Sequence, residues 1–334
     1  MGVTQGASAP AAAVLAVDAG NSKTDVALVS ADGEVLGAGR SGGFQPPVVG
    51  VEPAVDVLAE AVRQAAASAG IPAGSGPLAR HVSACLANAD FPAEEEALTA
   101  AIARRGWAPG VEVRNDTFAV LRAGVEQPRG VAVVCGAGIN CVGMLPDGRT
   151  TRFPAIGRIS GDWGGGGGLA DEALWYAARA ADGRGEPTEL SRAVPEHFRL
   201  RTMGELIEAL HFDRVPVSRR HEIAPVLFAV AAAGDPVARS LVDRQADEVV
   251  AMASVALEKL DLLSEPADVV LGGSVLAARH PQLDAGIRAR LAARAPKAVT
   301  HVVTAPPVLG AVLLGMDAVG APPSAQRRVR AQYA

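Results

Sequence analysis

The chain has 334 residues, of which 49% are hydrophobic and only 4% aromatic, and its formal net charge at pH 7 is −5. This length suits two domains of ordinary size, and the many small apolar residues suit helices packed on buried strands. A chain with net negative charge does not attract the phosphate backbone of a nucleic acid, so we expect a small ligand and not a nucleic acid as its partner.

The cysteines and the start of the chain indicate a cellular compartment. Cys85, Cys135 and Cys141 show no CxxC pattern and no Cys/His spacing typical of a metal site, so we interpret them as buried thiols in a reducing compartment. The first twenty residues have no basic segment, and their apolar part soon reaches Asp18, so we expect neither a signal peptide nor a membrane span. The sequence therefore predicts a cytoplasmic protein.

The first part of the chain predicts three antiparallel strands, followed by alternating helices and strands. The turn sequences AGNSKT and ADG separate the three strands, and a helix with apolar residues at helical spacing ends on Gly70. The predicted strands are 14–18, 25–30, 34–38, 80–87 and 111–114, and the predicted helices are 51–69, 93–105 and one after Asp116.

The same order of elements begins again after residue 130, although the two halves hardly match in sequence, which indicates an architectural duplication. The predicted strands are 131–136, 140–145, 150–155, 268–273 and 298–303, and the predicted helices are Leu169 to about Ala181, 282–293 and 308–318. We expect an N-terminal domain, 1–125, and a C-terminal domain, 126–334, with a helical insertion at about 188–261.

Two expectations concern the outer parts of the chain. The charged helices of the insertion form either an outer layer or the contact of a homodimer. The helix 308–318 can pack back on the N-terminal domain, and the tail from Pro322 is expected to be mobile.

Four glycine-containing turns follow directly after predicted strands: DAGNSKTD at 18–25, CGAGIN at 135–140, GDWGGGGG at 161–168 and LGGS at 271–274. Ligands bind at the carboxyl ends of strands in open α/β folds, where glycine lets backbone amides approach a phosphate. A single such turn is usually no more than a turn, but four can converge on one nucleotide. Neither a GxxxxGK[ST] loop nor a helix-opening GxGxxG motif is present, so the phosphate site is of another kind.

The ordered set VDAGNSKTDVALV, NDT, CGAGINC and LGGS resembles the superfamily of actin, heat-shock chaperones and sugar kinases. Within it the chain resembles the BadF/BadG/BcrA/BcrD ATPase family, in its N-acetylglucosamine kinase branch, from about Val14 to Met316. The resemblance implies duplicated ribonuclease-H-like (actin-like ATPase) α/β domains of β-β-β-α-β-α-β-α order with a cleft between them. It also implies ATP and Mg²⁺ as cofactors, and transfer of the γ-phosphate to the 6-hydroxyl of N-acetylglucosamine or glucosamine.

The resemblance assigns nucleotide-binding residues in three segments. Asp18 orients Mg²⁺, through water, and the first phosphate turn consists of Gly20, Asn21, Ser22, Lys23 and Thr24. The second phosphate turn consists of Gly136, Ala137 and Gly138, and the adenosine motif of Gly272, Gly273 and Ser274. The residues themselves leave open that each segment is an ordinary turn or a packing contact.

The aspartate of the NDT sequence, Asp116, is by the same resemblance the base that accepts the proton of the sugar hydroxyl. The residues alone allow another interpretation, in which Asn115 or Asp116 caps the following helix.

The resemblance places sugar hydroxyls at Asn115, Asn140 and Asp162, with Gly157 near the acetamido group. The family commonly has an asparagine in the loop after the third strand, where this chain has Gln45, so N-acetylmuramic acid and other hexosamines stay open as substrates. The glycine run 164–168 is interpreted as a close passage of the backbone beside ligand and a hinge at the next helix, with a flexible linker as the alternative.

The sequence argues against two other functions. Activators of the same family couple ATP hydrolysis to electron transfer through an iron–sulfur cluster held by paired cysteines, a pattern that this sequence lacks. A sugar-sensing regulator needs a DNA-binding module, for which the chain has no spare segment. The six histidines show neither metal-binding nor catalytic spacing, and none is assigned to catalysis.

Overall fold

The computed structural model describes residues 12–72 and 76–334, so the first part of the N-terminal stretch considered above lies outside it. The chain forms two compact units, each described here by itself. The first unit contains the residues up to Pro128 together with Val303–Ala334, and the second contains Arg129–Val302.

The first unit is built on a five-stranded mixed sheet of order β3-β2-β1-β4-β5. Its strands are β1 (Ala12–Ala19), β2 (Thr24–Val29), β3 (Val35–Ser41), β4 (Ala79–Leu86) and β5 (Gly110–Asn115). The first three are antiparallel, and β4 and β5 run parallel to β1. The central strand β1 is buried along its whole length because helices cover both faces of the sheet.

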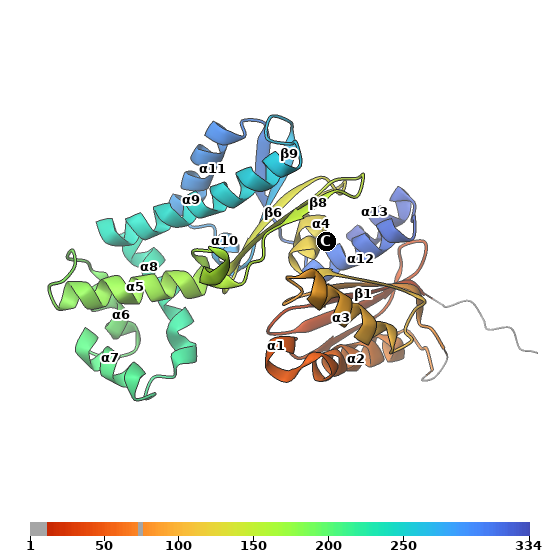
Figure 1. The fold of residues 1–334 in the computed structure, drawn as a ribbon, viewed down its shortest axis with the longest axis horizontal. Coiled ribbons are helices and arrows are strands. Elements are labelled where there is room, and N and C mark those ends of the chain that lie inside the picture. Colours follow the sequence, from red (N-terminus) through yellow and green to blue (C-terminus); the bar gives the residue numbers. More distant parts are fainter. Residues whose placement is uncertain (1–11, 73–75) are drawn as a thin grey trace, which may run out of the picture. The chain divides into compact units, whose positions relative to one another are not determined.

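Figure 1 shows α2 (Val51–Ser68) and α3 (Pro92–Ala103) on one face of this sheet, and α4 (Thr117–Gly124) and α12 (Pro307–Ala318) on the other. A short helix, α1 (Pro46–Val49), precedes α2. Glycines let these helices approach the sheet and one another closely. A Cβ atom on Gly39 of β3 would lie 2.1 Å from the carbonyl oxygen of Ala61 in α2, and one on Gly310 of α12 would lie 1.8 Å from that of Ala119 in α4. The alanine- and glycine-rich composition therefore serves close packing of helices.

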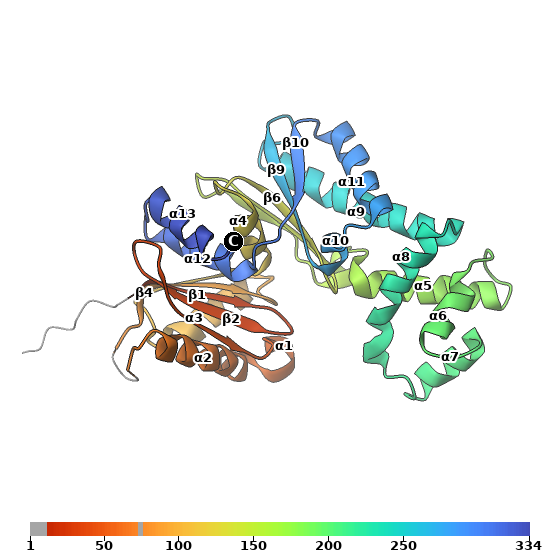
Figure 2. The same cartoon turned by 180° about the vertical axis from the view of Figure 1, so that it is seen from behind.

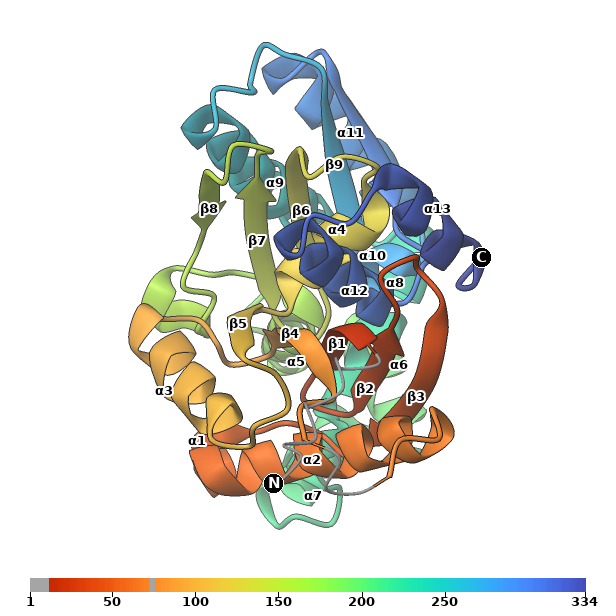
Figure 3. The same ribbon diagram turned by 90° about the vertical axis from the view of Figure 1, so that its right-hand side faces the viewer.

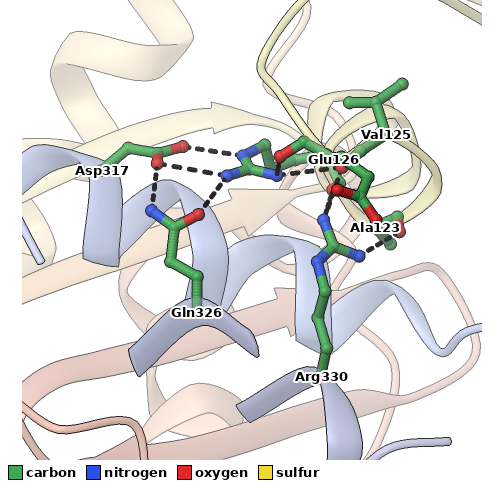
Figure 4. A network of polar contacts seen from close by, with 7 residues as sticks. Ala123, Val125, Glu126, Asp317, Gln326 and Arg330 are labelled. Carbon is green, nitrogen blue, oxygen red and sulfur yellow. Dashed lines mark hydrogen bonds and ion pairs between the residues drawn. The ribbon is translucent and has the colours of Figure 1, made fainter. Parts of the chain in front are cut away.

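The C-terminal tail is not mobile as expected but forms α13 (Pro323–Ala331), beside α12 (Figure 3), with Ala325 and Val329 buried. The buried guanidinium of Arg122 donates to the Asp317 carboxylate (2.7 Å), the Gln326 side chain (2.8 Å) and the Val125 carbonyl (3.0 Å). Arg330 of α13 donates to carbonyls at the C-terminal end of α4 (Figure 4). Helix ends need such donors for their last carbonyls, and α13 supplies one.

The second unit repeats this architecture with a sheet of order β10-β9-β6-β7-β8. Its strands are β6 (Gly130–Cys135), β7 (Ile139–Met144), β8 (Thr150–Arg152), β9 (Ala267–Gly272) and β10 (Ala298–Val302). Again three strands are antiparallel and two run parallel to the first of them. The predicted duplicated α/β fold is thus confirmed, although β8 is shorter than predicted because Pro154 has no N–H for the ladder.

The helices of the second unit include the predicted insertion. They are α5 (Gly165–Ala181), α6 (Leu190–His197), α7 (Met203–His211), α8 (Ile223–Ala232), α9 (Pro236–Lys259), α10 (Ser274–Ala277) and α11 (Pro281–Arg294), with 3-10 turns η1 (Gly157–Ser160) and η2 (Val217–Glu222). Figure 2 shows α11 and α9 beside β9 and β10. The second unit ends at Val302, earlier than the expected domain 126–334, because α12 and α13 pack within the first unit.

Within the part of the chain that the structure describes, no single helix has the length and apolar character to cross a bilayer. The bent pair 217–232 and 236–259 meets that measure only when its two helices are taken together.

Candidate functional site

The first unit gathers polar residues at the carboxyl edge of its sheet. Because β1, β4 and β5 are parallel, the residues at their carboxyl ends lie along one edge. Asp18 pairs with Cys85 in the register of β1 and β4, and the N–H of Asp116 donates to the Leu86 carbonyl (3.2 Å) just beyond β5. The structure thus places Asp18, Asn115 and Asp116 at the same edge.

Asp18 is a buried carboxylate, with 8% of its surface exposed. Burial raises its pKa to about 8, assisted by the negative charges of Asp116 and Asp25 and opposed by Lys23. Its side chain has no hydrogen-bond partner among the described residues. A buried carboxylate without a partner is costly unless a cation neutralises it, and Mg²⁺ prefers such oxygen ligands, so the site fits the metal that the resemblance implies.

Asp116 is surrounded by protein but keeps some contact with solvent. Burial raises its pKa to about 6, although hydrogen bonding to Thr117 lowers it. The capping role that the sequence left open falls to Asn115, whose side-chain oxygen accepts the N–H of Thr117 (3.0 Å), while Asp116 makes no side-chain cap bond. The carboxylate of Asp116 is therefore not needed to start α4.

The side chain of Asn115 is buried and makes hydrogen bonds within the first unit. Only 3% of its surface is exposed, and its amide donates to the Asp90 carboxylate (2.8 Å). With its oxygen on Thr117, the side chain fixes the backbone that carries Asp116.

The turn between β1 and β2 is joined to the loop after β3. Within the turn, the N–H of Gly20 donates to the Lys23 carbonyl (2.9 Å). The buried hydroxyl of Thr24 donates to the carbonyl of Gly42 in the loop (3.0 Å). The side-chain amide of Gln45 donates to the Asn21 carbonyl (3.0 Å), so this departure from the family pattern lies against the first phosphate turn.

Other members of the first phosphate turn have different surroundings. Asn21, Ser22 and Lys23 are exposed, and the Lys23 ammonium pairs with the Asp25 carboxylate (2.9 Å). Sequence reasoning missed Asn88, which has a positive φ of 61° and donates to the Asn21 side chain (3.1 Å). The available signal was the pair of polar residues Asn88 and Asp90 shortly after the end of β4, since polar residues at a strand's carboxyl end mark candidate ligand contacts.

The glycine run begins helix α5 rather than preceding it. Gly165 has a φ of 72°, and a Cβ atom there would lie 2.5 Å from the backbone of Gly138. The N–H groups of Gly166 and Gly167 donate to the carbonyls of Gly136 (2.7 Å) and Ala137 (2.9 Å). The flexible-linker interpretation is wrong, because the run lets the start of α5 press against the second phosphate turn.

This packing shapes the second phosphate turn. The first three N–H groups of α5 are taken by the turn and by the Gln245 side chain, whose oxygen accepts from Gly165 (3.0 Å). The N–H groups of Ala137 and Gly138 make no hydrogen bond within the described chain, so they are available to phosphate oxygens.

The adenosine motif is fixed to the same turn. Gly272 ends β9, paired with Val134, and Ser274 begins α10. Gly273 has a φ of 83°, and a Cβ atom on it would lie 2.4 Å from the backbone of Cys135. Three glycine segments distant in sequence therefore meet in the second unit.

A cavity of about 390 Å³ opens beside these segments. Its lining comprises Gly136, Ala137, Gly166 and Gly167 from the glycine segments, His221, Ala224, Pro225 and Phe228 from η2 and α8, and Ser274, Val275, Ala278 and His280 from around α10. The rings of Phe228 and His280 are stacked, with centroids 3.8 Å apart and planes within 3°. A largely apolar cavity with a flat aromatic wall and adjoining free amides suits a nucleoside with its phosphates.

Sequence reasoning missed the cavity residues His221, Phe228 and His280. They come from the helical insertion and from the start of α11, and they have no common spacing that could have revealed their meeting.

The residues assigned to the sugar in the second unit are only partly joined. Asp162 accepts hydrogen bonds from the Gly157 N–H (2.9 Å) and the Ser160 hydroxyl (2.7 Å), which closes the η1 turn. Asn140, on β7, accepts from the N–H of Cys141 (2.7 Å). Gly157 and Asp162 thus lie together, while Gln45 and Asn115 belong to the first unit.

Comparisons with known proteins identify relatives of this chain. An N-acetylmuramic acid/N-acetylglucosamine kinase of Clostridium acetobutylicum is 24% identical over 269 residues, which cover 79% of this chain and 85% of that protein. A crystal structure from Chromobacterium violaceum, of a protein assigned as an N-acetylglucosamine kinase, has a TM-score of 0.70 at 21% identity and covers 92% of this chain and 100% of that one.

A glucokinase of the ROK family from Streptomyces griseus, in complex with glucose and AMPPNP, has a TM-score of 0.54 at 17% identity, with coverage of 92% and 98%. These structures share the two-domain fold. Residues 15–315 match the BadF/BadG/BcrA/BcrD ATPase family. The chain therefore belongs to the BadF/BadG/BcrA/BcrD ATPase family and uses ATP.

Proposed function

We propose that the protein is an ATP-dependent amino-sugar kinase that transfers the γ-phosphoryl group to the 6-hydroxyl of N-acetylglucosamine. The relative from C. acetobutylicum, a kinase of N-acetylmuramic acid and N-acetylglucosamine, supports this substrate class. Glucosamine and N-acetylmuramic acid are the next acceptors to consider. The observation that carries the proposal is the carboxylate of Asp116 at the edge of the first sheet, where the side chain of Asn115 and not that of Asp116 caps α4.

In this proposal Asp116 orients the sugar hydroxyl and takes its proton. Phosphoryl transfer depends mainly on alignment and charge neutralisation, so the base acts late and needs only moderate strength. A pKa of about 6 leaves Asp116 ionised at pH 7 and still a better base than an ordinary aspartate.

Asp18 would hold Mg²⁺, directly or through water. When bound, the metal ion neutralises charge on the phosphates. The first phosphate turn, 20–24, and the amides of Ala137 and Gly138 would bind phosphate oxygens, and the cavity of the second unit would take the nucleoside.

The proposed sugar contacts are Gln45, Asn140 and Asp162, with Gly157 beside the acetamido group. Bidentate carboxylates and amides suit a ring of neutral hydroxyls, because a wrong sugar leaves buried polar groups unmatched. We further propose that the enzyme is a cytoplasmic homodimer.

The test is ADP release by the wild-type protein with ATP and Mg²⁺ across a panel of hexosamines and hexoses. We expect N-acetylglucosamine to stimulate release most strongly, with a phosphate on its 6-hydroxyl. Sugar-independent hydrolysis by a brown, iron-containing protein would instead support the activator function of the family. Burial raises the pKa of Cys135 to about 12 and that of Cys141 well above its usual range, which disfavours the thiolates that a cluster needs.

A further inference from the structure

The cavity of the second unit has three lining side chains with polar atoms: Ser274, His221 and His280. Adenine carries an amino donor at the position where guanine carries a carbonyl acceptor. A protein group can tell them apart only if its own role as donor or acceptor is fixed. The Ser274 hydroxyl rotates to suit either base, so it cannot discriminate.

His280 is equally adaptable. Burial lowers its pKa, so the ring is held neutral, and within the described chain no hydrogen bond decides which of its nitrogens carries the proton. Its ring is instead stacked on Phe228, which gives the cavity a flat wall. This pair can stack with any base, because every base has a π-face.

His221 differs because its tautomer is set by the backbone. Its Nδ1 lies 2.6 Å from the carbonyl oxygen of Ser218 within the η2 turn. A carbonyl can only accept, so Nδ1 carries the hydrogen, and in the neutral ring Nε2 is left as an acceptor. His221 lines the cavity, and within the described chain its Nε2 makes no hydrogen bond, so Nε2 is the ring nitrogen left for a ligand.

We propose that His221 accepts a hydrogen bond from the 6-amino group of adenine and thereby makes the enzyme select ATP over GTP. With guanine, the carbonyl oxygen would face the lone pair of Nε2. The helical insertion would then do more than line part of the cavity, because it would also determine which base the nucleotide site accepts. This inference rests on the nucleotide site of the proposed function but not on the identity of the sugar.

The experiment measures binding of AMPPNP and GMPPNP with Mg²⁺ to the full-length protein by calorimetry, without any sugar. The variants are His221→Gln, whose amide can turn either its oxygen or its nitrogen to the base, and His221→Phe, which keeps a ring without nitrogen. The matched control is His211→Ala, an exposed histidine of α7 outside the cavity.

We expect the wild-type protein and the His211→Ala control to prefer AMPPNP, and the ratio of the two affinities to fall about tenfold in His221→Gln and His221→Phe, as for loss of one well-matched hydrogen bond. An unchanged ratio in both variants, or equal affinities in the wild-type protein, would overturn base reading by His221 while leaving the kinase proposal standing. Binding of neither nucleotide to the wild-type protein would overturn both.

Discussion

Replacement of Asp18 by asparagine should stabilise the protein at neutral pH. In the unfolded chain this carboxyl has a pKa of 3.8, whereas burial raises it to about 8 in the folded protein. The folded state therefore binds more protons between these values, and its stability falls as the pH rises from about 4 to about 8. At 1.36 kcal/mol for each tenfold change, burial of this carboxyl costs about 4 kcal/mol at pH 7, because the folded state there holds a proton that the unfolded state releases.

Asparagine has the same shape and no charge to desolvate, but its buried amide still lacks partners, at a cost of about 1–3 kcal/mol. The net gain expected for Asp18→Asn is therefore about 1–3 kcal/mol at pH 7, with a flatter dependence on pH.

The assay is the free energy of unfolding in urea at pH 5, 6, 7 and 8, with Mg²⁺ removed by chelation. The control is Asp56→Asn on the exposed side of α2, which should keep the pH dependence of the wild-type protein. A variant less stable than the wild-type protein at pH 7, with the same slope against pH, would refute the reasoning that burial of the Asp18 carboxyl without a partner destabilises the folded protein.

Three further results are expected. Asp116 can take a proton only when it is ionised, so its pKa of about 6 predicts that kcat/KM falls about tenfold for each pH unit below that value. A pH profile of kcat/KM from pH 5 to pH 8 checks this. In thermal and urea unfolding, Gly165→Ala should lose at least about 2 kcal/mol through its positive φ and its contact with the second phosphate turn, whereas Gly168→Ala, which has open space, should gain up to about 1 kcal/mol. By the same measurements Arg122→Met should cost about 3 kcal/mol or more, since its buried network loses its donor, while the exposed Arg328→Met should cost less than about 1 kcal/mol.

Much of the fold could be predicted because the signals were local. Alternating apolar residues bounded by turn sequences marked the strands, and helical spacing marked α2 and α12. Parallel strands then bring their carboxyl ends to one edge, so the meeting of Asp18 and Asp116 follows from the order of elements.

The starts and ends of elements were harder to predict where tertiary contacts oppose local preference. Glycine costs about 1 kcal/mol relative to alanine within a helix, so the sequence placed the start of α5 at Leu169. The structure starts it at Gly165, because only glycine lets the helix reach the turn 136–138. The tail was misjudged for a similar reason, since Arg330 stabilises α13 through carbonyls of α4 that lie far away in sequence.

The cavity of the second unit was the least predictable part of the candidate site. Its glycine segments carry a recognisable motif, but His221, Phe228 and His280 meet only through the packing of an insertion whose position no sequence pattern encodes. A fixed tautomer, such as that of His221, depends on one backbone carbonyl and is invisible without coordinates.

The central claim is that the protein transfers the γ-phosphoryl group of ATP to an amino sugar with Asp116 as the base. The most direct measurement follows radiolabelled γ-phosphate from ATP to N-acetylglucosamine for the wild-type protein and Asp116→Asn, with ATP binding measured on the same samples. The account predicts that the variant binds ATP as the wild-type protein does and transfers phosphate at least about 100-fold more slowly. Transfer at the wild-type rate by the variant, or no transfer to any hexosamine by the wild-type protein, would contradict it.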